Sequence, residues 1–371
     1  MKQYKNHNTI LIAGGGTGGH LFPALAIGSE LHNKGYDIKY IGSKYGIESK
    51  ILKKMNTEYY LLNITGIQRR LSFKNIINNL LFPVRFLFSY LITKKILKRL
   101  NPIIVIGTGG YASGLPLLAS IRMNIKTLIH EQNSYPGLTT RKLSNKVDTV
   151  CITNLETKKY LDGNLVLTGI PIRKNFLQIN KSDACIKLGL SSNKKTIFVV
   201  GGSQGSEVFN RYFQKNYKFY IKNDIQLIWQ CGHKNLSKYK NMVHHKNILI
   251  KDFFDNINHA YCAADIIISR AGAMAINEIS FMKKAMILVP LASSAANHQF
   301  YNAKFFQDNN AAIVIEEKQL KQNIIEESIL KLFKNKEKLK LMGLNANNLI
   351  IKDAREKILN QINSVLKINK T

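Results

Sequence analysis

The sequence predicts an α/β protein made of two doubly wound domains with parallel sheets, which face each other across a cleft. Short β-rich runs alternate with helical stretches along the chain, and the first run enters a glycine-rich turn that opens a helix. The same strand, glycine turn and helix begin again in "KTIFVVGGSQGSEVFN". At 371 residues, of which 45% are hydrophobic, the chain has room for two cores. Domains of this kind bind ligands at the carboxyl ends of their strands.

Ten runs of apolar, β-favouring residues are predicted to form the strands of these Rossmann-like domains. They lie at residues 9–13, 38–41, 103–106, 127–129, 147–152, 196–200, 225–230, 247–250, 265–268 and 286–289. Gly169 and Pro171 interrupt the pattern in "LTGIPIRKNF", so we place the domains at 1–168 and 169–345. Residues from about 346 to 371 are expected to form a polar helix that packs back on the first domain.

The first strand meets its helix through a turn made almost entirely of glycine, "GGGTGG". Without a Cβ, the backbone there comes close to a ligand, and the N–H groups of the following helix suit a phosphate. Gly14, Gly16 and Gly19 also fit the dinucleotide fingerprint, which leaves an NADP-dependent oxidoreductase as an alternative. The second strand does not end in an acidic residue, which disfavours NAD, while Ser43 and Lys44 are placed to contact an NADP phosphate.

The net charge of +31 favours an anionic partner, such as nucleic acid, an anionic membrane surface or an anionic substrate. A compositionally biased genome explains the total charge equally well, because Lys, Asn and Ile are abundant throughout. A nucleic-acid-binding protein would interleave aromatic residues with its cations, whereas this chain carries a block of Leu, Phe and Ile among them. We therefore expect no nucleic acid partner.

The four cysteines lie far apart, with no C-x-x-C pair and no histidine in metal-ligand spacing. This pattern predicts buried thiols in a reducing cytosol. The first apolar run is too short for a signal sequence, and no run reaches the ~18–20 residues of a membrane-spanning helix. We expect a protein that is neither exported nor integral to a membrane.

One segment has the composition of a membrane-docking element. Between Glu58 and Glu131 there is no acidic residue, while ten basic residues surround the apolar stretch "NLLFPVRFLFSYLI". We expect residues 69–99 to bind an anionic membrane surface, where each basic residue contributes ~1 kcal/mol. The alternative is that residues 76–92 form a buried crossover helix with a solvated rim of cations.

Several further polar, glycine-containing stretches follow predicted strands and would line one edge of both sheets. They are "GTGGYASG", "HEQNSYPG", "SRAGAMAINE" and "ANHQFYNA". Together with "GGTGGH", "GIPIR" and "GGSQGS", they occur in the order of the MurG family, which the chain resembles from residue 9 to about 315. That family consists of the peptidoglycan N-acetylglucosaminyltransferases, which make lipid II from lipid I.

The resemblance implies a GT-B glycosyltransferase fold and an inverting, metal-independent transfer without a cofactor. The donor would be UDP-GlcNAc and the acceptor undecaprenyl-diphospho-MurNAc-pentapeptide (lipid I), whose C4 hydroxyl attacks the anomeric carbon. The protein would lie peripherally on the cytoplasmic face of the bacterial inner membrane. The sequence itself lacks the D-x-D type of acidic pair that would hold a metal beside the diphosphate.

The resemblance also implies a set of substrate-binding positions. Asn133 and Gln299 would contact the donor sugar, Glu278 the ribose, and Phe254 the uracil. Thr17, Gly18 and Gly19 would form a turn that contacts the donor, and Asn210 would position the sugar or the loop. Diphosphate contacts would come from one arginine, from the second glycine turn and from the start of a helix; the residues implied are Arg173, Ser203, Gln204, Ala273, Met274 and Ala275. Ala275, Asn297 and His298 depart from the family pattern, which puts details of donor recognition in doubt.

His20 is the preferred candidate for the catalytic base, because a histidine is ordinarily largely neutral at cytosolic pH and can take the acceptor proton. Glu131 and Tyr111 are the other candidates. The alternative for His20 is that it only caps or orients the helix after the glycine turn.

Overall fold

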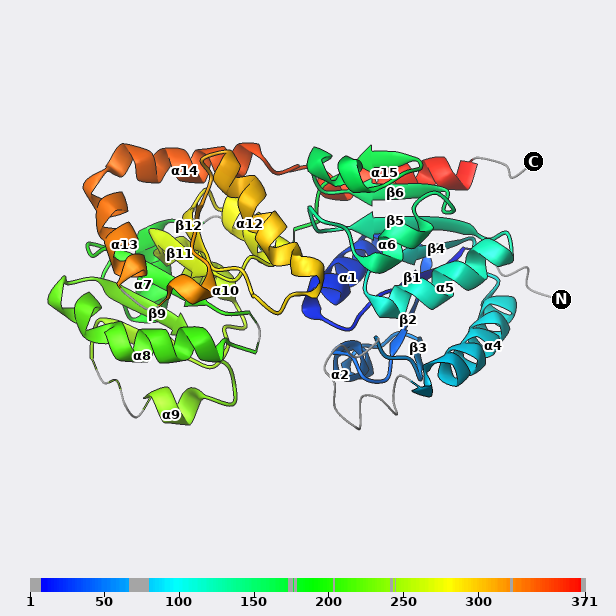
Figure 1. The fold of residues 1–371 in the computed structure, drawn as a ribbon, viewed down its shortest axis with the longest axis horizontal. Coiled ribbons are helices and arrows are strands. Elements are labelled where there is room, and N and C mark those ends of the chain that lie inside the picture. The colour runs from blue at the N-terminus through cyan, green and yellow to red at the C-terminus, as the bar shows by residue number, and fades with distance from the viewer. Residues whose placement is uncertain are drawn as a thin grey trace. The chain divides into compact units, whose positions relative to one another are not determined.

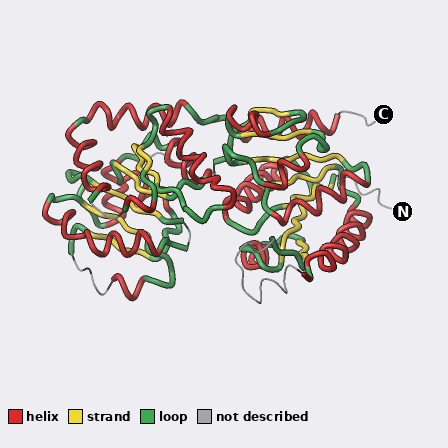
Figure 2. Tube along the Cα trace, in the orientation of Figure 1, coloured by secondary structure: helices red, strands yellow, loops and turns green. Residues whose placement is uncertain are grey.

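The computed structural model describes residues 8–66, 80–172, 176, 179–202, 204–240, 243, 245–320 and 323–367. The chain divides into two compact units (Figure 1). The first unit comprises Met1–Pro171 and Asp353–Thr371, and the second comprises Ile172–Lys352. In both units the strands are flanked by helices (Figure 2).

The first unit is built on a parallel sheet that contains seven strands among the described residues, in the order β3-β2-β1-β4-β5-β6-β7. The strands are β1 (Thr9–Ala13), β2 (Asp37–Ser43), β3 (Tyr59–Leu62), β4 (Ile104–Gly107), β5 (Lys126–Glu131), β6 (Thr149–Ile152) and β7 (Leu165–Leu167). The helices are α1 (Gly18–Asn33), α2 (Glu48–Ile51), η1 (Leu52–Lys54), α4 (Phe82–Leu100), α5 (Tyr111–Arg122), α6 (Leu138–Leu143), η2 (Leu155–Tyr160) and α15 (Ala354–Lys367).

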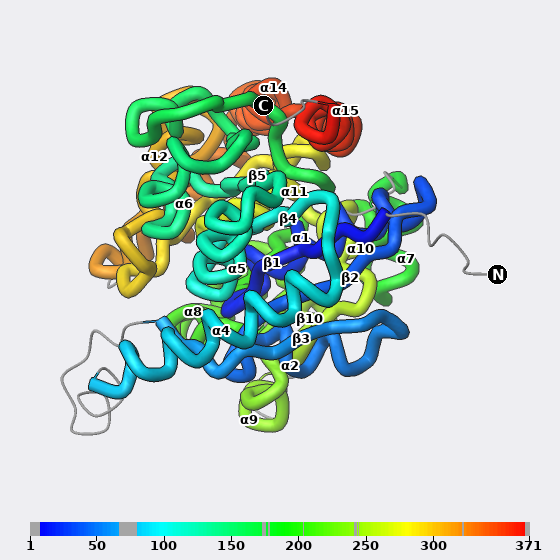
Figure 3. The backbone as a smooth tube through the Cα atoms, turned by 90° about the vertical axis from the view of Figure 1, so that its right-hand side faces the viewer, coloured from blue at the N-terminus to red at the C-terminus, as the bar shows by residue number. Residues whose placement is uncertain are grey.

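Successive side chains of each strand in the first sheet point to opposite faces, so they contribute to two cores, one on either face. Ile10 and Ile12 of β1 belong to a cluster with residues of α1 and α15. Leu11 and Ala13 belong to a second cluster, with residues of α4 and α5. Helices α4 and α15 accordingly lie on different sides of this unit (Figure 3). The last helix, α15, also contacts β5 and β6, and Gln361 donates to the Thr149 hydroxyl over 3.1 Å.

The second unit repeats the plan with a parallel sheet of six strands in its described part, in the order β10-β9-β8-β11-β12-β13. The strands are β8 (Thr196–Val200), β9 (Gln226–Gln230), β10 (Ile248–Lys251), β11 (Ile266–Ser269), β12 (Ala285–Leu288) and β13 (Ile313–Val314). The helices are α7 (Lys181–Leu188), α8 (Glu207–Lys222), α9 (Leu236–Lys240), α10 (Ile257–Ala263), α11 (Ala273–Phe281), η3 (Ala295–Asn297), α12 (His298–Asp308), η4 (Glu317–Gln319), α13 (Ile324–Lys334) and α14 (Lys336–Asn348).

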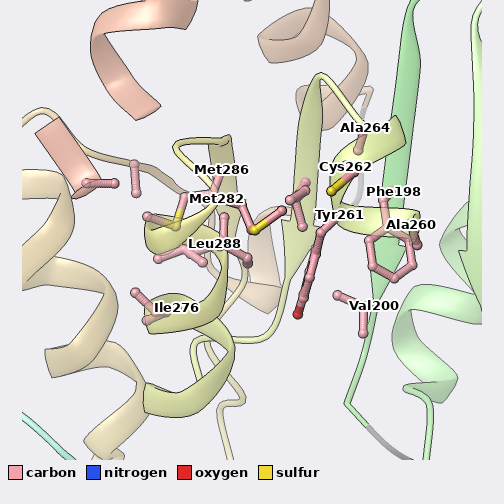
Figure 4. Packing of buried hydrophobic residues seen from close by; sticks show 14 of the residues in the cluster. Phe198, Val200, Ala260, Tyr261, Cys262, Ala264, Ile276, Met282, Met286 and Leu288 are labelled. Carbon is pink, nitrogen blue, oxygen red and sulfur yellow. The ribbon is translucent and has the colours of Figure 1, made fainter. Parts of the chain in front are cut away.

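The core of the second unit is likewise divided by its sheet. Phe198 and Val200 belong to a cluster that also contains Tyr261 of α10 and Ile276 of α11 (Figure 4). Ile197 and Val199 face the opposite cluster, which includes residues of α8 and α13. The ten strands predicted from the sequence are confirmed in both units, and β3, β7 and β13 are additional.

Helix α4 has an unusual distribution of side chains, because its exposed face is apolar. Ser89, Thr93 and Leu97 are its buried residues, whereas Phe88 is 63% exposed. The exposed apolar residues of the helix recur every three or four positions, so they share one face; they are Val84, Leu87, Phe88, Leu91 and Ile92. Leu80 and Leu81, which directly precede the helix, are also exposed. The alternative that this stretch is a buried crossover helix is therefore wrong for residues 80–92. Residues 67–79 lie outside the described part of the chain.

Among the described residues, no helix has the length and hydropathy needed to cross a bilayer.

Candidate active site

The first glycine turn folds around a buried carboxylate, that of Glu48. Its Oε2 accepts from the Gly16 N–H at 2.7 Å, and its Oε1 accepts from the Ser43 N–H at 2.8 Å. Gly15 has no room for a Cβ, which would overlap this carboxylate, and Gly16 has a φ of +86°. The Gly16 amide thus binds a side chain of its own domain.

This arrangement argues against the NADP-dependent oxidoreductase considered from the sequence. Ser43 is fully buried, its amide is bound by Glu48, and its hydroxyl donates to the Ile64 carbonyl at 2.6 Å. It is therefore not placed to bind a cofactor phosphate. The carboxylate under the turn would also repel a pyrophosphate at Gly16.

The start of α1 is the part of this turn that remains open. Thr17 is the exposed N-cap residue, and its side chain makes no capping hydrogen bond. A Cβ on Gly19 would meet only the Thr17 hydroxyl, at 3.7 Å, whereas one on Gly18 would meet the Phe22 ring at 2.9 Å. An anion can approach the first-turn N–H groups of this 16-residue helix most closely at Gly19.

His20 lies in the first turn of α1, and Thr17 occupies the capping position, so His20 does not cap this helix. Its Nδ1 is 3.1 Å from the Thr108 carbonyl oxygen and 3.1 Å from Oε1 of Gln132. The ring fits against two glycines of "GTGG", because a Cβ on Gly109 would come within 2.7 Å of Nδ1 and one on Gly110 within 3.0 Å of Cδ2. No described residue hydrogen-bonds to Nε2.

Glu131 is placed as a structural residue and not as a base. Its Oε1 accepts from the backbone N–H and the side-chain amide of Asn133, at 3.1 and 3.0 Å. Its Oε2 accepts from the Gly137 N–H at 3.0 Å and from the Thr140 hydroxyl at 2.5 Å. The side chain is buried and holds the loop that carries Asn133. The proposal of Glu131 as an alternative base does not fit these contacts, because all its lone pairs are engaged.

Tyr111 begins α5, and its ring packs against Gly16 and Gly66. Burial raises the pKa of Tyr111, and the nearby Glu48 carboxylate adds to the shift. Since a base must first lose its proton, this direction disfavours Tyr111 in that role. Of the three candidates, His20 is the one whose ring has a nitrogen, Nε2, without a hydrogen-bond partner among the described residues.

A second candidate region is a cavity of about 250 Å³ in the second unit. It is bounded by the second glycine turn, the end of β11, the start of α11 and residues of the β12–α12 connection, and is lined by Val200, Gly201, Gly202, Gly205, Ser206, Ser269, Arg270, Gly272, Ala275, Leu291 and Gln299. Two predicted residues, Ala275 and Gln299, are among the lining. Gln299 Oε1 accepts from the Leu291 N–H at 3.0 Å, which fixes the orientation of its amide.

Arg270 is a cavity residue that the sequence analysis missed, although its motif was noted. Its guanidinium is buried, donates to the Val289 carbonyl at 3.2 Å and the Ser206 hydroxyl at 2.8 Å, and pairs with Glu317 at 2.5 Å. Burial lowers the pKa of Arg270, and Glu317 opposes the shift, so the group remains a cation. The signal that could have revealed it is its position directly after a strand.

The remaining predicted positions are spread over the second unit. Asn210 is fully buried, donates to the Cys231 carbonyl at 2.9 Å and accepts from the Trp229 indole at 3.0 Å. It therefore supports the backbone beside the second glycine turn, and both polar atoms of its side chain are engaged within the domain. The Phe254 ring is buried against Phe198, with 5.8 Å between ring centroids.

Glu278 is buried on α11, where its Oε2 accepts from the Tyr261 hydroxyl at 3.3 Å. Ala273 and Met274 occupy the first turn of the same helix, and Gln204 is exposed in the glycine turn. The predictions for Arg173 and Ser203 fall outside the described residues.

Asn297 and His298 open α12 in a strained connection. Asn297 and the preceding Ala296 both have left-handed backbone angles, with φ of 54° and 51°. His298 Nδ1 lies 2.8 Å from the Ala295 carbonyl oxygen. These residues set the direction in which α12 presents Gln299.

Comparison with known proteins matches residues 10–152 to the glycosyltransferase family 28 N-terminal domain and residues 196–358 to its C-terminal domain. The chain is 33% identical, over the full length of both proteins, to a UDP-N-acetylglucosamine–N-acetylmuramyl-(pentapeptide) pyrophosphoryl-undecaprenol N-acetylglucosamine transferase of Flavobacterium psychrophilum. It is 35% identical to the protein of the same name from Acetivibrio thermocellus, with 96% of this chain and 98% of that one covered.

Among solved structures, the fold is similar to that of Acinetobacter baumannii MurG, with a TM-score of 0.74, 24% identity and coverage of 96% of this chain and 99% of that one. This likeness confirms the expected GT-B fold of two parallel-sheet α/β domains. The chain therefore belongs to glycosyltransferase family 28 and, within it, to the MurG family of N-acetylglucosamine transferases.

Proposed function

We propose that this protein transfers GlcNAc from UDP-GlcNAc to the C4 hydroxyl of MurNAc in lipid I, and so forms lipid II. The names of its full-length relatives support the donor and the lipid-linked acceptor. The observation that carries the chemistry is the setting of His20, whose Nδ1 faces two oxygen acceptors while Nε2 has no partner among the described residues.

In the proposed mechanism, Nε2 of His20 takes the proton of the acceptor hydroxyl as its oxygen bonds to the anomeric carbon. The bond from that carbon to the phosphate oxygen breaks on the opposite face, and UDP leaves with its electron pair. A single displacement of this kind inverts the anomeric configuration. The acceptor diphosphate is proposed to bind at the start of α1, near Thr17 and Gly19.

The donor is proposed to bind at the cavity of the second unit. The first-turn N–H groups of α11 at Ala275 and the buried Arg270 supply positive potential for the diphosphate without a metal. Gln299 would then bind the sugar hydroxyls and Glu278 the ribose. The roles of Arg173 and Ser203 remain as predicted from the resemblance.

The exposed apolar face of α4 is proposed to dock on the cytoplasmic surface of the inner membrane. Leu87 and Phe88 are 58% and 63% exposed, and Arg85, Lys94 and Lys95 lie on the same helix. A helix with this composition inserts its apolar face at the acyl boundary while its cations contact anionic headgroups. This position would bring the enzyme to its lipid acceptor.

The test is to incubate the protein with radiolabelled UDP-GlcNAc and lipid I in vesicles. We expect a disaccharide lipid with a β-glycosidic bond from an α-linked donor, formed at the same rate after treatment with EDTA. Retained configuration, or label released only as free GlcNAc, would refute the proposed transfer.

A further inference from the structure

A chain of hydrogen bonds in the first unit links the side chain of His130 to that of His20 through Gln132. This side chain is fully buried, and its Nε2 lies 2.8 Å from the Gly169 carbonyl oxygen. Burial lowers the pKa of His130, so the ring is neutral at cytosolic pH. A carbonyl oxygen only accepts hydrogen bonds, so Nε2 carries the single proton and Nδ1 carries the lone pair.

Gln132 is the next member of the chain, and its surroundings fix which way its amide points. Its nitrogen lies 2.9 Å from Nδ1 of His130, 2.9 Å from the His130 carbonyl oxygen and 3.1 Å from the Thr108 carbonyl oxygen. All three atoms are acceptors. The opposite orientation would place the amide oxygen against two carbonyl oxygens, so the NH₂ group must lie on this side.

The amide oxygen of Gln132 consequently faces His20. Nδ1 of His20 is 3.1 Å from this oxygen and 3.1 Å from the Thr108 carbonyl oxygen. A lone pair on Nδ1 would point at two oxygen atoms, whereas a proton there is accepted by both. The neutral ring is thus held with the proton on Nδ1 and the lone pair on Nε2.

We propose that Gln132, itself oriented by His130, is a positioning residue that keeps His20 in the Nδ1–H tautomer. The inference rests on the proposed role of His20 as the base, because only this tautomer offers Nε2 to the acceptor proton. The two glycines that pack against the ring leave it little freedom to flip, so the tautomer decides whether Nε2 presents a lone pair or a proton to the acceptor.

The expected loss of kcat depends on which hydrogen bond His20 keeps when Gln132 is replaced. Loss of the correct histidine tautomer lowers kcat by ~10⁴-fold in the serine protease triad. Here the Thr108 carbonyl still accepts from Nδ1 after the change, so we expect a smaller loss for Gln132→Met, of about tenfold in kcat. The donor KM should not change, since Gln132 does not contact the proposed donor cavity.

The experiment measures the tautomer directly in substrate-free, full-length protein. ¹⁵N-labelled histidine is observed by NMR, and the His20 signals are assigned by their loss in His20→Ala. In the wild type we expect a protonated Nδ1 and an unprotonated Nε2. In Gln132→Met we expect a mixture that includes the Nε2–H tautomer, together with the fall in kcat.

Gln361→Met is the matched control, because it makes the same change in the same unit and removes a bond only to Thr149. It should leave the His20 signals and kcat as they are. The inference is overturned if wild-type His20 carries its proton on Nε2, which can be read even if Gln132→Met does not fold. It is also overturned if Gln132→Met keeps the wild-type tautomer, whatever its kcat.

The role proposed for Gln132 and the role of His20 as the base can be refuted independently of each other. If His20→Ala retains kcat while the wild type shows the Nδ1–H tautomer, the base assignment is wrong and the hydrogen-bond chain stands. If His20→Ala loses kcat while the tautomer is Nε2–H, the base assignment stands and the role of Gln132 falls.

Discussion

Two acidic residues of the first unit show how hydrogen bonding separates a structural carboxylate from a catalytic group. Glu48 accepts two backbone N–H bonds beneath the glycine turn, and Glu131 accepts four bonds under the loop of Asn133. The Glu131 carboxylate has no unused acceptor position for a substrate proton, and each oxygen of Glu48 is held by a backbone N–H of its own domain. His20, in contrast, uses one ring nitrogen for its support and has no described partner at the other.

Glu131→Gln is predicted to affect stability more than catalysis. The new NH₂ group would face N–H and O–H donors, which leaves buried groups unpaired and lowers the free energy of unfolding by ~1–3 kcal/mol. We expect kcat at 25 °C to fall less than tenfold. The free energy of unfolding is measured on the same variant by urea denaturation. Thr140→Val removes one of the four bonds and should have a smaller effect of the same kind. A loss of kcat like that of His20→Ala, at unchanged stability, would restore Glu131 as a base.

Glu278→Ala is predicted to raise the donor KM and to weaken inhibition by UDP, because the ribose hydroxyls would lose their acceptor. The same change also removes the partner of the Tyr261 hydroxyl. Tyr261→Phe is therefore the matched control, since it breaks that bond and keeps the carboxylate. Equal changes in UDP affinity for the two variants would mean that Glu278 serves the fold and not the nucleotide.

Among the elements, helix α4 exposes apolar side chains that a helix at its position in the fold is expected to bury. As the crossover between β3 and β4 it should bury its apolar side chains, yet Ser89 and Thr93 are buried and Phe88 is exposed. A contiguous exposed apolar face marks an interaction surface. The cations on the same helix, Arg85, Lys94 and Lys95, are the reason why we propose an anionic membrane as its partner.

Replacing Arg85, Lys94 and Lys95 by Ser is predicted to weaken binding to anionic vesicles. At ~1 kcal/mol per cation near the surface, the partition coefficient should fall by about 100-fold in sedimentation at low salt. Replacing Lys336, Lys338 and Lys340 of α14 by Ser removes the same charge from another helix and should change binding little. If both variants lose binding equally, net charge and not α4 directs the protein to the membrane.

The strands missed by the sequence analysis share a physical cause. β3, β7 and β13 are all edge strands, and none of their residues is buried except Leu62 of β3. Central strands are covered on both faces and therefore carry continuous apolar runs, which an edge strand does not need. The sequence pattern is therefore informative at the centre of each sheet and weak at its margins.

Local sequence motifs predicted the candidate site residues better than the residues that hold them in place by hydrogen bonds. His20 follows from the first glycine turn, while Ala275 and Gln299 follow from the family resemblance, which rests on short sequence-local motifs. Glu48 meets Gly16 across 32 positions and Gln132 meets His20 across 112, so these contacts depend on the tertiary fold. No spacing rule could have found them.

At the scale of the whole molecule, each unit is assigned one task. The first carries the proposed base and membrane face, and the second carries the cavity proposed for the donor. Ligand-induced protection from hydrogen exchange should therefore be confined to one unit when only UDP is added. We expect slower exchange of amides at 200–202 and 270–275, measured by mass spectrometry.

Ribose and phosphate in equal concentration provide the control for that exchange experiment, because they lack the linked nucleotide and should protect neither unit. Protection centred on residues 14–20 of the first unit would instead place the nucleotide at the first glycine turn.

The central claim, that this glycosyltransferase works through His20, is tested most directly by the pH dependence of kcat in the wild type and in His20→Ala. The account predicts that the wild type loses activity on an acidic limb, because a protonated imidazole cannot accept the proton of the acceptor hydroxyl. It predicts that His20→Ala has no such limb, a kcat lower by ~10²-fold or more and a nearly unchanged donor KM. A variant that keeps the limb and most of its kcat would contradict the account.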